Sequence, residues 1–333
     1  MKVPLSSLIE RMPADTREQV DKARQRWNQP VREVLRQETG LRLNRPEPGR
    51  GPGAQQTLQD VAGIPIRVEP GMPEKLRTVE LDEAMALRVI VGRRRATLEM
   101  LRGSAAETQR LVTELKRAGH AERLLEGREV HLNGAEAVAD RLLRELDGPD
   151  PVKEILAVNA DVLGVYTYHK PKQGTLLGGD MPTGVRIELY WGVIGLVAEL
   201  LGRSVESLTV VVLAHELAHA YTHLACDIDG HRWASPAFTQ SEHELIEGLA
   251  QFYTARVCDR LREQFPDVLQ TYTLLLGKQP GAYKTHVEWV EKSQPEEVRF
   301  AMIETRRRGI GRLEEFEAAL VDLRGRLREG QAT

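Results

Sequence analysis

The residues His215-Glu216-Leu217-Ala218-His219 form an H-E-x-x-H sequence. On an α-helix, His215 and His219 project from one face, about 40° apart, so both imidazoles can reach a single metal ion. Glu216 lies beside them, where it can face a water on the metal without binding the metal itself. Two neutral nitrogens, one further ligand and an open position for water describe a catalytic zinc site.

The residues around this motif favour a buried helix. In VVVLAHELAHAYTHL, residues 210–224, Val211 and Val212 extend the histidine face, whereas Leu213 and Leu217 lie on the opposite face. A helix that is apolar on both sides is buried, and polar side chains inside it are costly unless they have partners. A metal centre accounts for these polar groups; the alternative is a pair of hydrogen-bonded core histidines with a paired glutamate.

A zinc site of this kind needs a third protein ligand. The metzincin arrangement requires glycine at position 222 and histidine at position 225, where this chain has Thr222 and Ala225. His223 is about 12 Å further along the helix axis than His215, whereas two ligands of one zinc lie within about 4 Å of each other. We therefore predict that His223 is a helix-end polar group or supports the ligands.

The helix that follows, SEHELIEGLAQFYTARVCDRL, offers Glu244 and Glu247. Ser241 and Glu244 have the spacing of a capping box, which gives Glu244 a structural role at the start of the helix. Glu247 lies one turn deeper, beside Gly248 and Ala250, whose small size lets this helix approach the zinc helix. Glu247 is the predicted third ligand.

HELAH followed by EGLAQFY resembles the gluzincin branch of the zincin metallopeptidases. In that branch two histidines of H-E-x-x-H and a glutamate on a later helix hold zinc, and the resemblance covers roughly residues 160–260. It implies a zinc-dependent peptidase of α+β class, with a zincin-like domain built from a small sheet, the zinc helix and the helices that follow. It also implies that a strand from Val185 to Trp191 is the sheet edge along which a peptide substrate lies.

The resemblance further implies a mechanism. Zinc polarises the scissile carbonyl and acidifies a water, and Glu216 acts as the general base. In gluzincins a tyrosine or histidine downstream of the glutamate stabilises the oxyanion, and Tyr283 and His286 are the candidates here. The alternative is a regulatory or interaction protein with a zincin-like core, similar to ImmA/IrrE-type regulators, that acts on or binds one partner protein. The presence of Glu216 favours a catalytic zinc site over a structural one, because a structural zinc site is closed by a fourth protein ligand.

Local patterns predict the elements that position these residues. Residues 161–169 are rich in β-branched and aromatic side chains, and residues 185–191 alternate strictly between apolar and polar, so both are predicted strands. A short helix over 193–201 is closed by Gly202. Ser204 is a good N-cap for the zinc helix, which we expect to begin near Val205.

Segments rich in proline and glycine divide the rest of the chain, whose 333 residues suffice for one large domain or two. RPEPGRGPG cannot continue a helix or a central strand, and GPDP marks a second boundary. We predict an N-terminal helical segment over 1–45, a linker over 46–57, a mainly helical region over 58–150 and the metallopeptidase domain over 151–333.

Composition argues against several other classes of protein. The net charge of −3, from 46 basic and 49 acidic residues, does not fit a dedicated nucleic-acid binder. No signal peptide and no apolar run of about 18 residues is present, so we expect a cytoplasmic protein outside the membrane. Cys226 and Cys258 are expected to be reduced thiols. The expected partner is a protein or peptide substrate, and the oligomeric state stays open.

Overall fold

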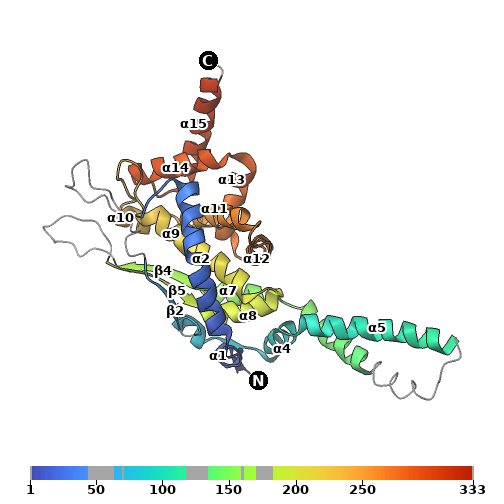
Figure 1. Cartoon of the computed structure of the whole chain (residues 1–333). Helices are drawn as coiled ribbons and strands as arrows, with labels where there is room; N and C mark the ends of the chain where they lie inside the picture. The colour runs from blue at the N-terminus through green and yellow to red at the C-terminus, as the bar shows by residue number, and fades with distance from the viewer. Residues whose placement is uncertain are drawn as a thin grey trace.

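The computed structural model describes an α+β chain, mostly helical, around a small mixed sheet of three strands (Figure 1). The α+β class is therefore confirmed. The strands of this sheet are β2 (Ile66–Glu69), β4 (Gly164–His169) and β5 (Thr183–Tyr190). The described residues are 2–43, 64–69, 71–117, 134–158, 161–169 and 183–331, so the predicted linker over 46–57 lies outside them.

Strand β5 occupies the middle of this sheet. It pairs in parallel with β2, where Ile66 lies opposite Ile187, and antiparallel with β4, where Tyr166 lies opposite Ile187. The prediction that residues 185–191 form the edge strand is therefore wrong, because β2, from a region expected to be helical, covers the second side of β5. Within the described residues, β4 is an edge strand next to β5.

The alternating pattern of β5 is confirmed. Ile187 and Leu189 are fully buried on one face of the strand. On the other face, Arg186 Nε donates to Glu188 Oε1 at 2.5 Å, and the Tyr190 hydroxyl donates to Glu188 Oε2 at 3.1 Å. The polar residues of this strand thus satisfy one another on the more open face of the sheet.

Helices α8 (Trp191–Leu201) and α9 (Val205–Leu224) follow β5 directly. Gly202 ends α8 in the left-handed conformation, with φ of 62°, which glycine adopts without steric cost. The Ser204 hydroxyl oxygen accepts a hydrogen bond from the Ser207 N–H at 3.1 Å and caps α9. The predicted end of α8 at Gly202 and the predicted start of α9 after Ser204 are both confirmed. Helix α9 is buried and packs against β4 and β5.

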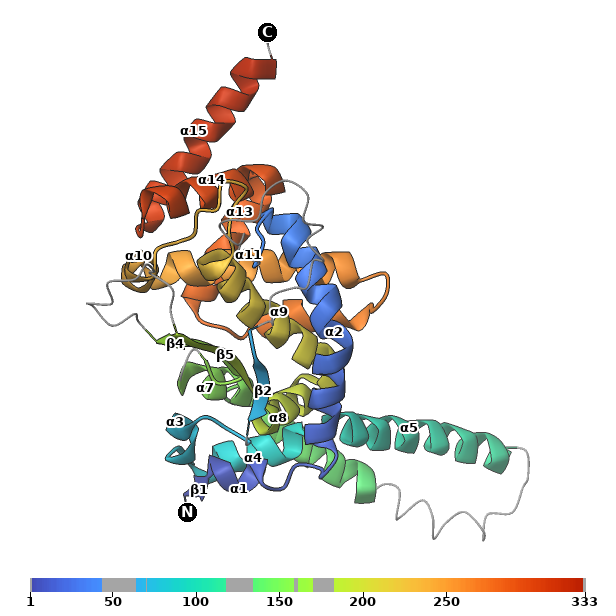
Figure 2. The same ribbon diagram turned by 60° about the vertical axis from the view of Figure 1, so that its left-hand side comes forward.

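The N-terminal helix α2 (Thr16–Thr39) lies beside α9 (Figure 2). Its residues Val20, Val31 and Leu35 are fully buried in the same hydrophobic core as α9. At its C-terminal end, Glu38 accepts hydrogen bonds from Arg256 and Arg260 of α11 (His243–Leu261), each at 2.8 Å. Residues from the predicted segment 1–45 therefore contribute to the core that supports the H-E-x-x-H helix.

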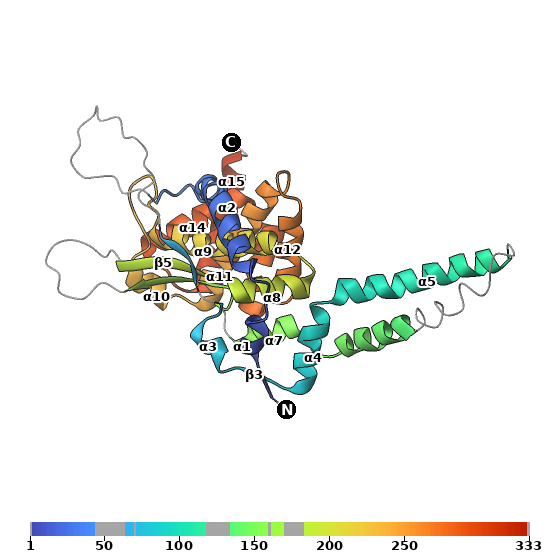
Figure 3. The same ribbon diagram turned by 60° about the horizontal axis from the view of Figure 1, so that its bottom comes forward.

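The other elements surround this core or extend from it. Helix α5 (Arg95–Arg117), with the helical residues 134–144 beside it, projects away from the core (Figure 3). No helix among the described residues is long and apolar enough to cross a membrane. Cys226 and Cys258 are buried and free.

The remaining strands and helices complete the described part of the chain. They are β1 (Val3–Pro4), α1 (Leu5–Ile9), α3 (Glu74–Arg77), β3 (Glu80–Leu81), α4 (Glu83–Gly92), η1 (Glu145–Asp147), α7 (Pro151–Val158), α10 (Ser235–Gln240), α12 (Asp267–Leu276), η2 (Gly281–Lys284), α13 (His286–Lys292), α14 (Pro295–Arg308) and α15 (Leu313–Gln331).

Candidate metal centre

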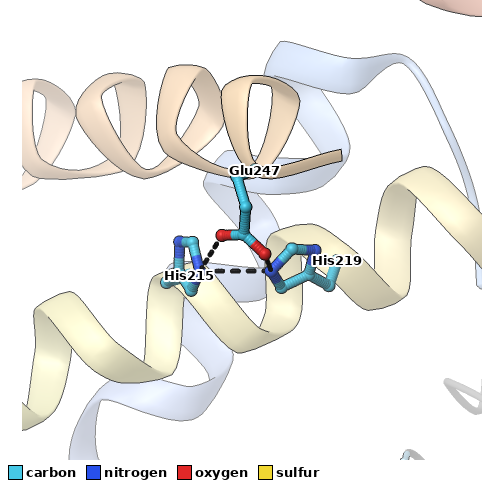
Figure 4. A group of neighbouring side chains, drawn as sticks. All are labelled: His215, His219 and Glu247. Atoms are coloured by element: carbon cyan, nitrogen blue, oxygen red, sulfur yellow. Dashed lines mark hydrogen bonds and ion pairs between the residues drawn. The ribbon is translucent and has the colours of Figure 1, made fainter. Parts of the chain in front are cut away.

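The packing of α11 against α9 brings the three predicted ligands together (Figure 4). The Nε2 atoms of His215 and His219 are 3.1 Å apart. Glu247 Oε2 lies 3.2 Å from His215 Nε2, and Glu247 Oε1 lies 3.5 Å from His219 Nε2. His219 and Glu247 are only 7% and 4% exposed. These three side chains could hold a metal ion.

The separations fit one tetrahedral ion. With zinc–ligand bonds of about 2.0–2.1 Å, neighbouring ligand atoms of a tetrahedral site lie about 3.3–3.4 Å apart, and the observed values of 3.1 to 3.5 Å bracket this spacing. Glu247 Oε2 is buried and makes no well-directed hydrogen bond despite its contact with His215. An acceptor in that position suits a cation better than a shared proton.

Without metal, the triad itself holds a proton. Burial opposes the charged form of Glu247, but His219 and His215 outweigh it and hold the pKa of Glu247 well below its usual range. Burial likewise disfavours charge on His219, yet the Glu247 carboxylate raises the pKa of His219 to about 9. Burial lowers the pKa of His215. A metal that binds here must displace the proton on His219.

Glu216 lies between the triad and the edge strand. Glu216 is 4% exposed, and the backbone N–H of Tyr166 in β4 is near enough to act on its carboxylate. Burial raises the pKa of Glu216 to about 8. Glu216 is not among the residues whose ligand atoms converge on one point.

The main chain of Tyr166 points away from β5. The Tyr190 N–H donates to Leu163 O at 3.0 Å, and hydrogen-bonded pairs alternate along an antiparallel ladder, so Tyr166 occupies a position that does not bond to β5. Its outward N–H therefore reaches Glu216. Among the described strands, the outer edge of β4 thus adjoins the carboxylate that neighbours the triad.

Tyr283, on η2, lies against the triad. Its ring centroid is 5.7 Å from that of His215. Burial, together with the carboxylates of Glu247 and Asp161, raises the pKa of Tyr283, so the hydroxyl keeps its proton. The structure therefore brings this predicted residue to the site as a proton donor.

His286 has a different environment. Its Nδ1 is 3.0 Å from the carbonyl oxygen of Tyr283 and its Nε2 is 2.7 Å from the Tyr272 hydroxyl. Burial lowers the pKa of His286 to about 4, so the ring is neutral, with Nδ1–H donating and Nε2 accepting. Both nitrogens are thus engaged away from the triad, and His286 holds the main chain that carries Tyr283.

His223 is not a ligand, as predicted. Its Nδ1 contacts the Tyr166 hydroxyl at 2.9 Å, its Nε2 contacts Ser235 Oγ at 3.0 Å, and its ring stacks on Phe238 with centroids 4.1 Å apart. Burial and the nearby Arg306 lower the pKa of His223 to about 3. The residue joins the end of α9 to β4 and α10.

The predicted capping box of Ser241 and Glu244 is wrong. The Ser241 hydroxyl donates to Ala237 O at 2.8 Å and so belongs to the end of α10. Helix α11 begins after Glu242, whose N–H donates to Gly311 O at 2.7 Å. Glu244 is exposed at the start of α11 and makes no such cap.

The expected role of Gly248 is also wrong. A Cβ atom at this position would lie 2.7 Å from the Trp289 ring and 3.3 Å from Thr285 Cβ. Gly248 therefore allows α13 to approach α11, and it does not face the H-E-x-x-H helix.

Two neighbours of the triad are not predicted by the sequence patterns. His243 Nδ1 lies 3.8 Å from Glu247 Oε1, and its side chain is 55% exposed. The i,i+4 spacing from Glu247 is the signal that could have found it. Asp161 precedes β4. Burial raises the pKa of its carboxyl group, and the charges of His219, Glu247, His215 and His243 also act on that pKa. No local pattern marks Asp161, because only the folding of β4 against α9 brings it here.

A second group of possible ligands, Asp227, Asp229 and His231, is already satisfied by protein contacts. Asp227 Oδ1 accepts from the Asp229 and His231 amides at 3.0 and 2.8 Å, while Arg307 pairs with both aspartates. This segment is a turn fixed to α14.

Comparison of the chain with protein-family models, with curated proteins and with solved structures found no match. Functional assignment therefore rests on the residues of the site.

Proposed function

We propose that this protein is a zinc-dependent peptidase that hydrolyses peptide bonds. The observation that carries the proposal is the convergence of His215, His219 and Glu247 at spacings suited to one tetrahedral ion, with the carboxylate of Glu216 beside them. Three protein ligands leave a fourth position for water, which is the arrangement of catalytic rather than structural zinc.

Each neighbouring residue has a role in this proposal. Zinc, when bound, supplies a Lewis acid that acidifies a water and polarises the substrate carbonyl. Glu216 takes a proton from the attacking water and transfers it to the amine that leaves when the C–N bond breaks. The protonated hydroxyl of Tyr283 donates to the oxygen that becomes negative. His286 positions the main chain of η2 and does not touch the reacting atoms.

The edge that β4 presents among the described strands is the proposed substrate platform. Gly164 and Tyr166 direct their main-chain groups away from β5, by the alternation of hydrogen-bonded pairs along the β4–β5 ladder. An extended peptide can add to such an edge through main-chain hydrogen bonds. This strand replaces residues 185–191 in that role.

Metal content and hydrolysis test the proposal together. Wild-type protein should hold one zinc per chain and cleave a general substrate such as casein. Glu216→Gln should keep the zinc and lose hydrolysis, because Glu216 is not a ligand. Loss of zinc in Glu216→Gln, or unchanged turnover, would refute this assignment of roles.

The second candidate function is a regulatory or interaction protein with a zincin-like core that acts on or binds one partner protein. The projecting α5 and residues 134–144 favour it, since Met100 and Val138 are 65% and 59% exposed there. Bound zinc without cleavage of casein or of other general substrates would favour this second candidate.

A further inference from the structure

Two buried polar atoms at the candidate metal centre have no hydrogen-bond partner within the described part of the chain. They are His215 Nδ1 on α9 and Gln251 Oε1 on α11, and both are shielded from solvent. Gln251 is only 3% exposed, and its other amide atom, Nε2, donates to Gln279 Oε1 at 3.3 Å. Buried polar atoms in native proteins are nearly always paired, so each of these two atoms calls for a partner.

Gln251 lies on the part of α11 that faces both α9 and the segment before η2. It is one turn beyond Glu247 and about 40° from it around the helix axis, whereas Gly248 is about 100° from Glu247. Glu247 faces α9, where its carboxylate meets His215, and Gly248 faces α13. The Gln251 side chain therefore projects between these two directions, in agreement with its contact with Gln279.

The direction of α11 places Gln251 on the His215 side of the centre. Glu247 Oε1 lies 3.5 Å from His219 Nε2 and 3.8 Å from His243 Nδ1, so the residue one turn before Glu247 is on the His219 side. Glu247 Oε2 lies on the other side, 3.2 Å from His215 Nε2. The residue one turn after Glu247 is therefore on the His215 side, and the second ring nitrogen of His215 is directed toward α11 (Figure 4).

Metal binding determines whether His215 Nδ1 is a donor. When Nε2 gives its lone pair to zinc, the ring proton has to be on Nδ1, which then needs an acceptor. The amide oxygen of Gln251 is an acceptor only. In ligating histidines the second nitrogen almost always donates to an oxygen atom, and this contact fixes the ring and strengthens metal binding. The two unpaired atoms are thus complementary when zinc is bound.

The contact with Gln279 extends this connection toward Tyr283. Gln279 lies between α12 and η2, four residues before Tyr283. The ring of Tyr283 is in turn 5.7 Å from that of His215. A Gln251 side chain that bonds to both His215 and Gln279 would tie a metal ligand to the segment that carries Tyr283.

We propose that Gln251 is a positioning residue whose amide oxygen accepts the Nδ1–H of zinc-bound His215 while its amide nitrogen holds Gln279. The inference rests on the zinc site of the proposed function and adds a residue that couples zinc binding to the position of Tyr283. It requires that the affinity for zinc depend on the acceptor at position 251. It also requires that zinc stabilise the segment over 277–284 through Gln251.

Zinc affinity, measured by competition with a chromophoric chelator, tests the first requirement. Gln251→Leu removes the acceptor and should weaken zinc binding at least about tenfold, whereas Gln251→Glu keeps an acceptor oxygen and should stay within about threefold of wild type. Thr254→Val is the control, because Thr254 is fully buried on the same helix and its hydroxyl donates to Ala250 O at 2.7 Å. Its zinc affinity should equal that of wild type. Unchanged affinity in Gln251→Leu, or equal losses in Gln251→Leu and Gln251→Glu, would overturn the proposal.

Hydrogen exchange followed by mass spectrometry tests the second requirement. Saturating zinc should slow amide exchange over residues 277–284 in wild type, because the segment is then held through Gln251. This slowing should disappear in zinc-saturated Gln251→Leu and persist in Thr254→Val. Equal slowing in wild type and Gln251→Leu would overturn the coupling between zinc and this segment.

The melting temperature of the metal-free proteins shows whether the variants fold. If Gln251→Leu does not fold, Gln251→Met takes its place, and loss of structure in both would assign Gln251 a role in folding alone and overturn the proposal. Absence of zinc binding by wild type would refute the metal centre and this inference with it. Casein hydrolysis is measured in parallel: the expected zinc affinities without hydrolysis refute only the peptidase function, whereas hydrolysis with unchanged zinc affinity in Gln251→Leu refutes only the role of Gln251.

Discussion

Gly164 of β4 lies directly against the side chain of Glu216 in α9. A Cβ atom on Gly164 would approach Glu216 Cγ to 3.2 Å, Val212 Cγ1 to 2.8 Å and the Glu188 carbonyl oxygen to 3.2 Å. The absence of a side chain at this position lets the edge strand and the H-E-x-x-H helix approach closely enough for the Tyr166 N–H to reach the Glu216 carboxylate. The geometry of the proposed general base therefore depends on a residue in a different element.

Gly164→Ala should impair catalysis more than metal binding. The added methyl group has to displace α9 or β4, which should cost about 1–3 kcal/mol of stability. A displacement of about 1 Å at the general base should lower kcat/KM on the order of a hundredfold. Zinc analysis and casein hydrolysis check this, with Gly103→Ala as control, because nothing lies within 4 Å of a Cβ there. Full activity in Gly164→Ala would contradict the proposed role of this contact.

The two glutamates of α11 should behave differently. Glu247→Ala should lose most zinc and all hydrolysis, because two histidines alone hold zinc weakly. Glu244→Ala should keep both, and its free energy of unfolding should change by less than about 0.5 kcal/mol, since Glu244 is exposed and caps nothing. Metal analysis of the two purified variants decides the matter, and the reverse pattern would make Glu244 the third ligand.

Removal of the Tyr283 hydroxyl should slow the chemical step. Tyr283→Phe keeps the buried ring but removes a donor, so kcat should fall on the order of a hundredfold with little change in KM or zinc content. Tyr272→Phe is the comparison, because its hydroxyl contacts His286 and not the triad. Its kcat should fall by less than about tenfold. Equal losses in the two variants would show that Tyr283 acts only through packing.

His223 should make the protein sensitive to acid. Its pKa falls from an ordinary value of 6.5 to about 3 in the folded state, so below pH 6.5 the unfolded chain binds a proton that the folded chain excludes. Stability should therefore decline as the pH falls from 6.5 towards 3, by about 1.4 kcal/mol per pH unit from this group. Above pH 6.5 this contribution is constant.

Urea unfolding of metal-free protein at pH 6.5 and pH 4.5 measures this effect. His223→Phe should be less stable than wild type at pH 6.5, since the hydrogen bonds of His223 with Tyr166 and Ser235 are lost. Its stability should nevertheless fall less between the two pH values, by about 2–3 kcal/mol. His231→Gln, at an exposed histidine, should show the same fall as wild type. An identical fall in His223→Phe would contradict the assignment.

Part of the candidate metal centre could be predicted because it depends on residues a few positions apart. The spacing of His215 and His219 within one helix fixes their common face, since 3.6 residues make a turn. The exclusion of His223 follows from the same geometry and is confirmed by its contacts with Tyr166 and Ser235. The prediction of Glu247 on a second helix agrees with the structure, although two of its supporting reasons, the capping box and the role of Gly248, are wrong.

Sequence patterns were enough to predict the ligand-bearing helices, the alternation of β5 and the helix boundary at Gly202, because each depends on residues a few positions apart. Tertiary packing sets the pairing of β2 with β5, the place of β4 at the edge of the described sheet, and the approach of Tyr283 to the triad. Strand order and the packing of distant segments depend on long-range pairing and burial. A local pattern of side chains does not specify which distant segment a strand or helix will contact.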